Sequence, residues 1–96
     1  MKFHKNLIFR VHAVQRMFSR NISEIEVHEV LKNGDVIEEY LEDKPYPSCL
    51  IFCHVKSRPL HIVTAINNEE KITIIITVYE PDPHLWENDF KKRRKT

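Results

Sequence analysis

Three polar side chains near the start of the chain, His12, Arg16 and Arg20, follow one another at intervals of four residues. On a helix this spacing places them on one face. Such a face suits RNA cleavage without a metal ion, because histidine can take up or donate a proton while guanidinium groups stabilise negative charge on phosphorus. The alternative is an ordinary exposed helix face whose arginines pair with acids of the next helix.

A second set of residues, Arg58, His61 and Tyr79, is expected to meet at one end of a β-sheet. His61 lies near the start of a predicted strand over 60–67, and Tyr79 ends a predicted strand over 71–79. Antiparallel neighbours bring the start of one strand beside the end of the other, so the two side chains are close if they share a face. With Arg58 in the preceding loop, they would form an acid/base and phosphate site. A structural histidine and a core tyrosine explain each residue singly.

The charges are unevenly distributed, although the net charge is only +1. Residues 1–23 hold five Lys/Arg and no acid, residues 24–43 hold eight acids and one lysine, and the tail over 91–96 is basic. We expect the basic helix and tail to contact RNA phosphate while the acidic middle faces elsewhere. The alternative is a solvated acidic face and a frayed tail. The candidate RNA-binding residues are Arg20, Lys91, Lys92, Arg93 and Arg94.

The sequence indicates neither a cofactor nor a metal. Cys49 and Cys53 are expected to lie on one strand and point the same way, with Cα atoms about 13 Å apart, beyond the ~7 Å limit for a disulfide. No histidine or cysteine spacing matches a zinc site. Gly34 is the only glycine in the protein, which argues against a glycine-rich phosphate loop.

Two helices are predicted in the first third of the chain. Apolar residues at helical spacing predict the first helix over 11–19, with the apolar side opposite the polar face described above. Ser23 and Glu26 form a capping box that begins a second helix over 24–33. Gly34 is expected to end this helix in the left-handed conformation. The apolar residues of the first helix are Val11, Val14, Met17 and Phe18.

After Gly34 the pattern changes to short segments rich in Val, Ile, Thr and aromatic residues. The predicted strands cover 36–41, 49–56, 60–67 and 71–79, and short links predict an antiparallel meander for the last three. Asp82 and Pro83 allow a short C-terminal helix, which Trp86 and Phe90 would dock onto the body. The expected fold is α+β: two N-terminal helices packed on a four-stranded antiparallel sheet.

The chain has 96 residues, 42% of them hydrophobic, and we expect residues 1–96 to form a single domain with a basic tail. No segment approaches the ~20 apolar residues of a membrane helix. The N-terminal residues lack the apolar core and cleavage site of a signal peptide. A cytoplasmic protein without a membrane partner is therefore expected.

Four motifs together identify a family. They are His12-Ala13 with Arg16-Met17, Arg20 and Ile22-Ser23, then Asn33-Gly34, Arg58 to His61, and Thr77 to Pro83. Over residues 10–94 the chain resembles the domain-of-unknown-function family 4258 (DUF4258), whose members carry these motifs. Members of that family look like small RelE-like ribonuclease toxins, including the MqsR-like type, in which N-terminal helices lie on a curved antiparallel sheet.

The resemblance implies the toxin of a toxin–antitoxin pair, a metal-independent endoribonuclease acting on mRNA. Its partners would be RNA, including ribosome-bound mRNA, and an antitoxin protein. A second copy of the chain is a further candidate partner, through an exposed final strand or the predicted helix of Trp86 and Phe90; the alternative is that either element completes the core of a monomer. Histidine would act as acid or base, arginine would hold phosphate, and tyrosine would orient the attacking hydroxyl or donate a proton. The alternative is a non-catalytic module that binds a partner chain through its sheet edge. The candidate catalytic residues are His12, Arg16, Arg58, His61 and Tyr79.

Overall fold

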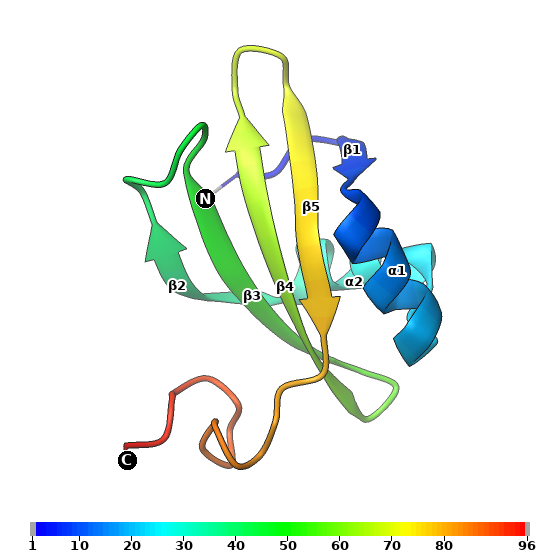
Figure 1. The fold of residues 1–96 in the computed structure, drawn as a ribbon, viewed down its shortest axis with the longest axis vertical. Coiled ribbons are helices and arrows are strands. Elements are labelled where there is room, and N and C mark those ends of the chain that lie inside the picture. Colours follow the sequence, from blue (N-terminus) through cyan, green and yellow to red (C-terminus); the bar gives the residue numbers. More distant parts are fainter. Residues whose placement is uncertain (1, 96) are drawn as a thin grey trace.

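A curved five-stranded sheet forms the centre of the structure, a computed structural model that describes residues 2–95 (Figure 1). The strands lie in the order β1-β5-β4-β3-β2, and two helices fall between β1 and β2 in the chain. Residues 2–95 contain these two helices, and neither is long and apolar enough to span a bilayer. The elements are β1 (Asn6–Phe9), α1 (Val11–Arg20), α2 (Glu24–Asn33), β2 (Asp35–Tyr40), β3 (Ser48–Val55), β4 (Arg58–Asn67) and β5 (Ile72–Tyr79).

The prediction of a four-stranded antiparallel sheet is wrong, because β1 adds a fifth strand parallel to β5. Asn6 lies opposite Ile72 and Phe9 opposite Ile75, and the Arg10 amide continues the ladder by donating to the Ile75 carbonyl at 3.0 Å. The four residues of β1 are too few to show a strand period. Their partner lies near the other end of the chain, so no local pattern indicates the pairing.

Strands β2 to β5 form the expected antiparallel order, and the last three are joined by short turns. Lys56 and Ser57 between β3 and β4 both have positive φ, 53° and 68°. Two consecutive residues with positive φ are typical of the two-residue turns of β-hairpins, in which the twist of the turn matches the twist of the two strands that it joins. In the β4–β5 ladder His61 lies opposite Tyr79, with an irregularity in register between Val63 and Thr64.

One core cluster joins both helices to the sheet. Val27 and Val30 of α2 are fully buried against β3 and β4, whose Ile51 and Ile62 belong to the same cluster. The predicted capping box of α2 is confirmed: the Glu26 amide donates to Ser23 Oγ at 3.1 Å, and the Ser23 amide donates to Glu26 Oε1 at 2.8 Å. The local signal therefore sets where α2 begins and how it meets the sheet.

Gly34 ends α2 as expected, but the predicted left-handed conformation is wrong, because its φ and ψ are −79° and 167°. A glycine is required here because there is no room for a side chain. A Cβ atom at this position would lie 2.5 Å from the Val30 carbonyl oxygen, 2.7 Å from Ile51 Cγ2 and 2.8 Å from the Phe52 carbonyl oxygen. The chain thus passes from α2 into β2 in direct contact with β3.

The predicted apolar side of α1 is not packed on the sheet. Val11, Val14 and Phe18 are 73%, 51% and 91% exposed, whereas Ala13 is fully buried and Met17 is partly buried against the core. The helix contacts the sheet at β5 through its narrow Ala13–Met17 side. Helical spacing revealed an apolar stripe, but spacing alone does not identify the element that covers it.

The C-terminal helix expected after Asp82 is absent from residues 81–95, which we call the C-terminal strap. Asp82 caps a single turn, in which its carbonyl accepts the Leu85 and Trp86 amides at 2.9 and 3.0 Å. The chain then turns back so that Trp86 is only 3% exposed and packs on His61, their ring centroids 4.5 Å apart. The chain therefore does not continue as a helix after this turn, and the indole of Trp86 is buried against the sheet instead.

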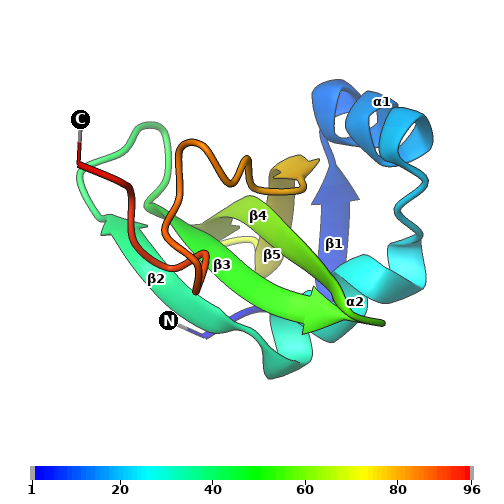
Figure 2. The same ribbon diagram turned by 90° about the horizontal axis from the view of Figure 1, so that it is seen from below.

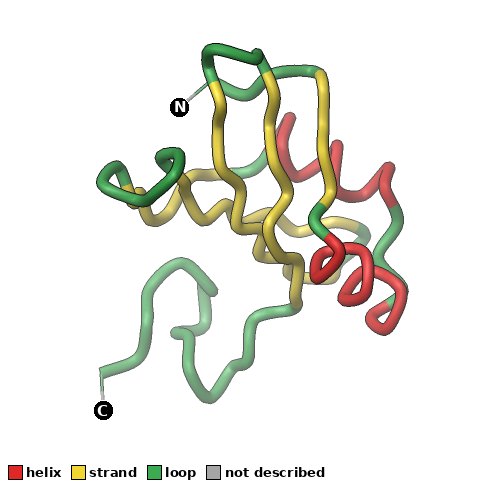
Figure 3. Tube along the Cα trace, turned by 45° about the horizontal axis from the view of Figure 1, so that its top comes forward, coloured by secondary structure: helices red, strands yellow, loops and turns green. Residues whose placement is uncertain are grey.

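The strap runs from the end of β5 back toward β2, below the sheet in Figure 1 and across β4 and β3 in Figure 2. Figure 3 shows it as a continuous loop. The strap covers the second face of the sheet, since Phe90 lies against Phe52 of β3 and Arg93 pairs with Glu38 of β2.

Replacing Gly34 by alanine is expected to lower the free energy of unfolding by about 2–3 kcal/mol, as in other overpacked sites. The added Cβ would press on two main-chain oxygens, which cannot move without shifting α2 or β3. Urea unfolding followed by circular dichroism measures the change. Lys32→Ala on the exposed side of α2 is the matched control, and an equally small effect of both variants would contradict the packing described here.

Candidate functional site

A groove of about 310 Å³ lies between α1, the end of β5 and the C-terminal strap. It brings together four of the residues selected from the sequence: Arg16 and Arg20 of α1, Tyr79 of β5 and Arg93 of the strap. The other lining residues are Thr77, Glu80, Asp82, Leu85 and Trp86. Three guanidinium groups and a phenol in one groove can bind an anionic ligand such as a phosphodiester.

The two arginines of α1 are exposed and form no salt bridge with a carboxylate among the described residues. The acids of the groove have other partners. Glu80 pairs with Arg58 at 3.4 Å, and Asp82 Oδ1 accepts the His84 amide at 2.8 Å. Arg16 and Arg20 therefore present their charge toward the groove.

Behind Tyr79 lies His61, which is completely buried. The Tyr79 hydroxyl oxygen is 3.2 Å from His61 Nδ1, and His61 Nε2 is 2.7 Å from the carbonyl oxygen of Phe90 in the strap. The predicted juxtaposition of His61 and Tyr79 is confirmed. Rings of Trp86, Tyr79 and Phe52 surround the imidazole with centroid distances of 4.5, 5.3 and 5.8 Å.

Burial shifts the protonation of both groups toward their neutral forms. It lowers the pKa of His61 below its ordinary 6.5, while the hydrogen bond to the Phe90 carbonyl and the charge of Glu38 act in the opposite direction. Burial also raises the pKa of Tyr79 above 10.0, although nearby Arg93 favours the phenolate. At neutral pH the pair consists of a neutral imidazole and a phenol.

Arg58, predicted to join His61 and Tyr79, instead holds the link between α1 and α2. Its guanidinium donates to the carbonyls of Arg20 and Asn21 at 3.0 and 3.1 Å and contacts Glu26 Oε2 at 3.0 Å. The pKa of Glu26 is lowered, first by its hydrogen bond from the Ser23 amide and then, against the effect of burial, by Arg58. Arg58 therefore supports the groove from outside, by fixing the end of α1.

His12, the remaining candidate, is exposed on α1 but does not line the groove. His12 shares a helical face with Arg16 and Arg20 but lies one turn nearer the N-terminal end of α1, outside the residues that line the groove. The arrangement thus separates one predicted catalytic set into a groove-facing part and a solvent-facing part.

Residues 91–95 of the basic tail are neither frayed nor turned away from the acids, while Thr96 lies outside the described residues. Lys91 pairs with Asp35 at 3.1 Å, and Arg93 pairs with Glu38 at 3.1 Å while its guanidinium lies 4.7 Å from the Trp86 ring centroid. Burial alone would raise the pKa of Glu38, but hydrogen bonds from Arg93 and Tyr40 hold it below its ordinary value. The acids of β2 therefore bind the strap, contrary to the expectation that they face elsewhere.

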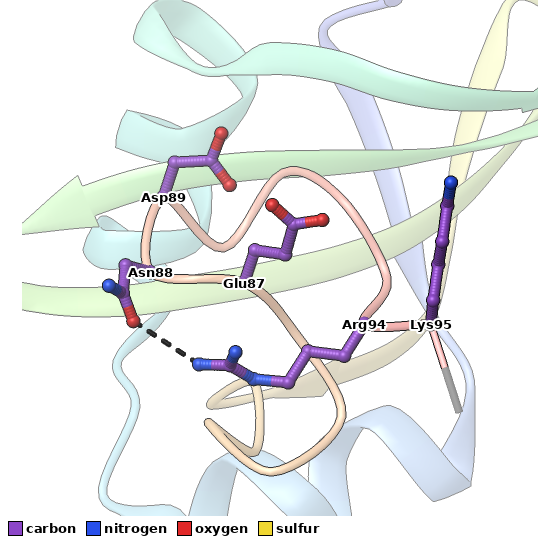
Figure 4. A pocket seen from close by; sticks show the side chains of 5 residues that line it. All are labelled: Glu87, Asn88, Asp89, Arg94 and Lys95. Atoms are coloured by element: carbon purple, nitrogen blue, oxygen red, sulfur yellow. Dashed lines mark hydrogen bonds between the residues drawn. The ribbon is translucent and has the colours of Figure 1, made fainter.

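Two other predicted RNA-binding residues lie at the outside of the strap. Lys92 is exposed, and Arg94 is held by the Pro83 carbonyl at 2.8 Å and by Asn88 Oδ1 at 3.2 Å. Arg94 borders a separate hollow of about 520 Å³ inside the strap, with Glu87, Asp89 and Lys95 on the same rim (Figure 4). Two acids and two bases balance there, so this hollow lacks the excess of positive charge found in the α1 groove.

Within residues 2–95 no group of three or more His, Cys, Asp or Glu side chains is arranged to hold a metal ion. Cys49 and Cys53 are free and lie on β3, as predicted. Burial raises the pKa of the Cys49 thiol to about 11, so it is an unreactive part of the core.

The family model described as "Domain of unknown function (DUF4258)" matches residues 9–80, well over half of the chain. The chain belongs to the DUF4258 family. Neither a curated protein nor a solved structure matches it. The DUF4258 match ends at Glu80, where β5 gives way to the strap, so the strap lies beyond the matched region although it lines the groove.

The strap contains the functional residues that sequence reasoning missed. Trp86 and Phe90 were expected only to dock a helix. Instead, Trp86 lines the groove, and the main-chain carbonyl of Phe90 accepts a hydrogen bond from His61. A main-chain carbonyl has no sequence signature. The one available signal was the four-residue spacing of two aromatic residues, which predicted docking without its geometry.

Arg58→Ala in this DUF4258 protein is expected to lower the free energy of unfolding by about 2 kcal/mol, because two carbonyls and the Glu26 carboxylate lose their partner. Thermal and urea unfolding measure the loss, with the exposed Lys92→Ala as control. Unchanged stability of the Arg58→Ala variant would contradict this structural role.

Stability should decrease as the pH falls below about 6.5. The lowered pKa of His61 means that the unfolded chain binds a proton at a pH where the folded protein does not, so acid favours unfolding. The contribution of neutral His61 to the free energy of unfolding is complete above the pKa of histidine in the unfolded chain and is lost as the pH falls below it. The free energy of unfolding then changes by at most about 1.4 kcal/mol per pH unit. His61→Gln removes this pH dependence. Comparing the free energies of unfolding of His61→Gln and wild type at about pH 7.5 and 5.5 separates the effect of His61 from that of the exposed histidines, which both proteins share. Parallel curves for both proteins would refute a neutral buried His61.

Proposed function

We propose that this DUF4258 protein is a metal-independent endoribonuclease that cleaves mRNA in the cytoplasm, as the toxin of a toxin–antitoxin pair. The observation that carries the proposal is the convergence of Arg16, Arg20 and Tyr79 on one groove, with His61 directly behind the phenol. These are the group types that phosphodiester cleavage requires when no metal supplies charge.

Arg16 and Arg20 would hold the phosphate. They lie one helical turn apart, face the groove and have no competing salt bridge in the described part of the chain. Guanidinium groups donate two parallel hydrogen bonds to phosphate oxygens, and this stabilisation increases as charge accumulates in the transition state. Arg93 adds positive charge at the opposite wall, although it shares that charge with Glu38.

Tyr79 would carry the proton transfer. In cleavage of RNA the 2′-oxygen attacks phosphorus and the bond to the 5′-oxygen breaks, leaving a 2′,3′-cyclic phosphate and a 5′-hydroxyl. The proton of the 2′-hydroxyl must leave as the new bond forms. Tyr79 lines the groove and its hydroxyl contacts His61, so a proton acceptor lies behind the group that meets the substrate.

A second candidate function is a non-catalytic module that binds a partner chain. It is favoured by the exposed apolar stripe of Val11, Val14 and Phe18 on α1, beside β1 at the edge of the sheet. An apolar stripe of this kind on a small protein indicates a contact surface. In a toxin, the same surface would be available to an antitoxin while the groove remained the catalytic site.

Purified wild-type protein is expected to cleave single-stranded RNA in the presence of EDTA and to leave 2′,3′-cyclic phosphate ends. Tyr79→Phe and the double variant Arg16→Ala/Arg20→Ala should each lower the rate by about 100-fold, because they remove the proton acceptor or the charge on phosphate. Gln15→Ala, an exposed residue of the same helix, is the matched control.

Induced expression in a bacterial host, with total RNA followed over time, tests the same variants in cells. Growth arrest with new RNA ends that disappear in the folded Tyr79→Phe variant supports the ribonuclease. Arrest without RNA cleavage, abolished by Phe18→Ser and not by Tyr79→Phe, would replace it with the interaction module.

A further inference from the structure

The hydrogen bonds of His61 define which of its nitrogens carries the proton. A carbonyl oxygen can only accept, so the 2.7 Å contact with Phe90 requires a proton on His61 Nε2. In the neutral ring Nδ1 is then a bare acceptor, and the Tyr79 hydroxyl, 3.2 Å away, must donate to it. The three groups form a directed chain from the groove to the strap.

We propose that the main-chain carbonyl of Phe90 is a positioning group of the site: it fixes the tautomer of His61 and thereby turns the Tyr79 hydroxyl proton inward, leaving the oxygen lone pairs toward the groove. The catalytic value of this arrangement rests on the proposed ribonuclease function. The positioning itself is a property of the free protein.

The strap holds the Phe90 carbonyl firmly in place. Phe90 has a φ of 59°, in the left-handed region that side chains other than glycine and asparagine adopt rarely. Its amide donates to the Glu87 carbonyl at 2.8 Å, and the Glu87 amide donates to the Lys92 carbonyl at 2.8 Å. Beyond this turn Arg93 is tied to Glu38 of β2. The unusual backbone conformation is thus braced on both sides and aims the carbonyl at the imidazole.

The chain of groups gives a balanced proton path. The 2′-hydroxyl proton moves to the Tyr79 oxygen as the 2′-oxygen attacks phosphorus, and the former Tyr79 proton moves to His61 Nδ1. The 5′-oxygen leaves and takes a proton from water, which becomes hydroxide. His61 is then an imidazolium whose second N–H still donates to Phe90. The proton on Nδ1 returns to the Tyr79 oxygen, and the proton that Tyr79 received passes to the hydroxide, which restores water and the neutral pair.

The charged and titratable groups around His61 come from three elements. Glu38 of β2 favours the imidazolium, Arg93 of the strap opposes it, and Tyr79 of β5 receives and returns the proton. Because the two opposite charges are paired with each other, the Phe90 carbonyl remains the contact that supports the protonated ring directly.

Two substitutions at Phe90 separate the carbonyl from the aromatic ring. Phe90→Val and Phe90→Asn both remove the ring packing, but asparagine tolerates a positive φ while a β-branched residue does not. The first variant should displace the carbonyl, and the second should keep it in place. Comparison of the two therefore reports on the direction of the carbonyl.

The readout is the ¹⁵N NMR spectrum of the His61 ring in the full-length protein without RNA, at about pH 7, where an unperturbed imidazole is partly neutral. Wild type and Phe90→Asn should show a neutral ring protonated at Nε2 alone, with a slowly exchanging Tyr79 hydroxyl proton. Phe90→Val should show both tautomers and a fast-exchanging hydroxyl. A wild-type ring protonated at Nδ1 would overturn the proposal, even if Phe90→Val fails to fold. An unchanged tautomer in folded Phe90→Val would do the same.

RNA cleavage by the same proteins distinguishes this inference from the proposed function. A cleavage rate about tenfold lower in Phe90→Val than in Phe90→Asn would show that the position of the Phe90 carbonyl affects the proton transfer. Equal rates in two variants with different tautomers would remove Phe90 from the mechanism. If wild type shows the expected tautomer yet cleaves no RNA, the ribonuclease proposal fails while the positioning of Tyr79 stands.

Discussion

A fully buried imidazole needs a partner for each nitrogen, because an unsatisfied polar group inside a protein costs on the order of 1–3 kcal/mol. His61 meets this requirement with one group from β5 and one from the strap. The strap must therefore return across the sheet, and in returning it carries Trp86 and Arg93 to the groove. Much of the site's geometry follows from the hydrogen bonding of one ring.

Burial from two sides also explains the composition of the central strands. α2 covers one face of β3 and β4 and the strap covers part of the other, so successive residues of β3 and β4 are buried instead of alternating with exposed ones. Strands of this kind carry continuous apolar runs. Four polar residues remain buried in these strands: Ser48, His61, Thr64 and Asn67. Of these, His61 is hydrogen-bonded to the strap and Thr64 to β5.

Sequence reasoning succeeded where a short-range rule applies. Ser23 and Glu26 marked the start of α2, and hairpin geometry placed His61 beside Tyr79. It failed where distant segments decide the structure. β1 pairs with a strand 66 residues further along the chain (Asn6 with Ile72), and the strap follows a path defined by the groups it satisfies. Arg58 was grouped with the wrong partners because a long side chain reaches well beyond its own strand end.

The parallel contact between β1 and β5 has a consequence for the order of events during synthesis. The first strand leaves the ribosome early, but its partner emerges only after every other element of the sheet. Until then β1 remains without its neighbour and α1 lacks the strand on which Ala13 packs. Such long-range pairing is slow to form, because the intervening chain must first be ordered. The groove is therefore complete only after β5 and the strap have both been synthesised and close the fold together.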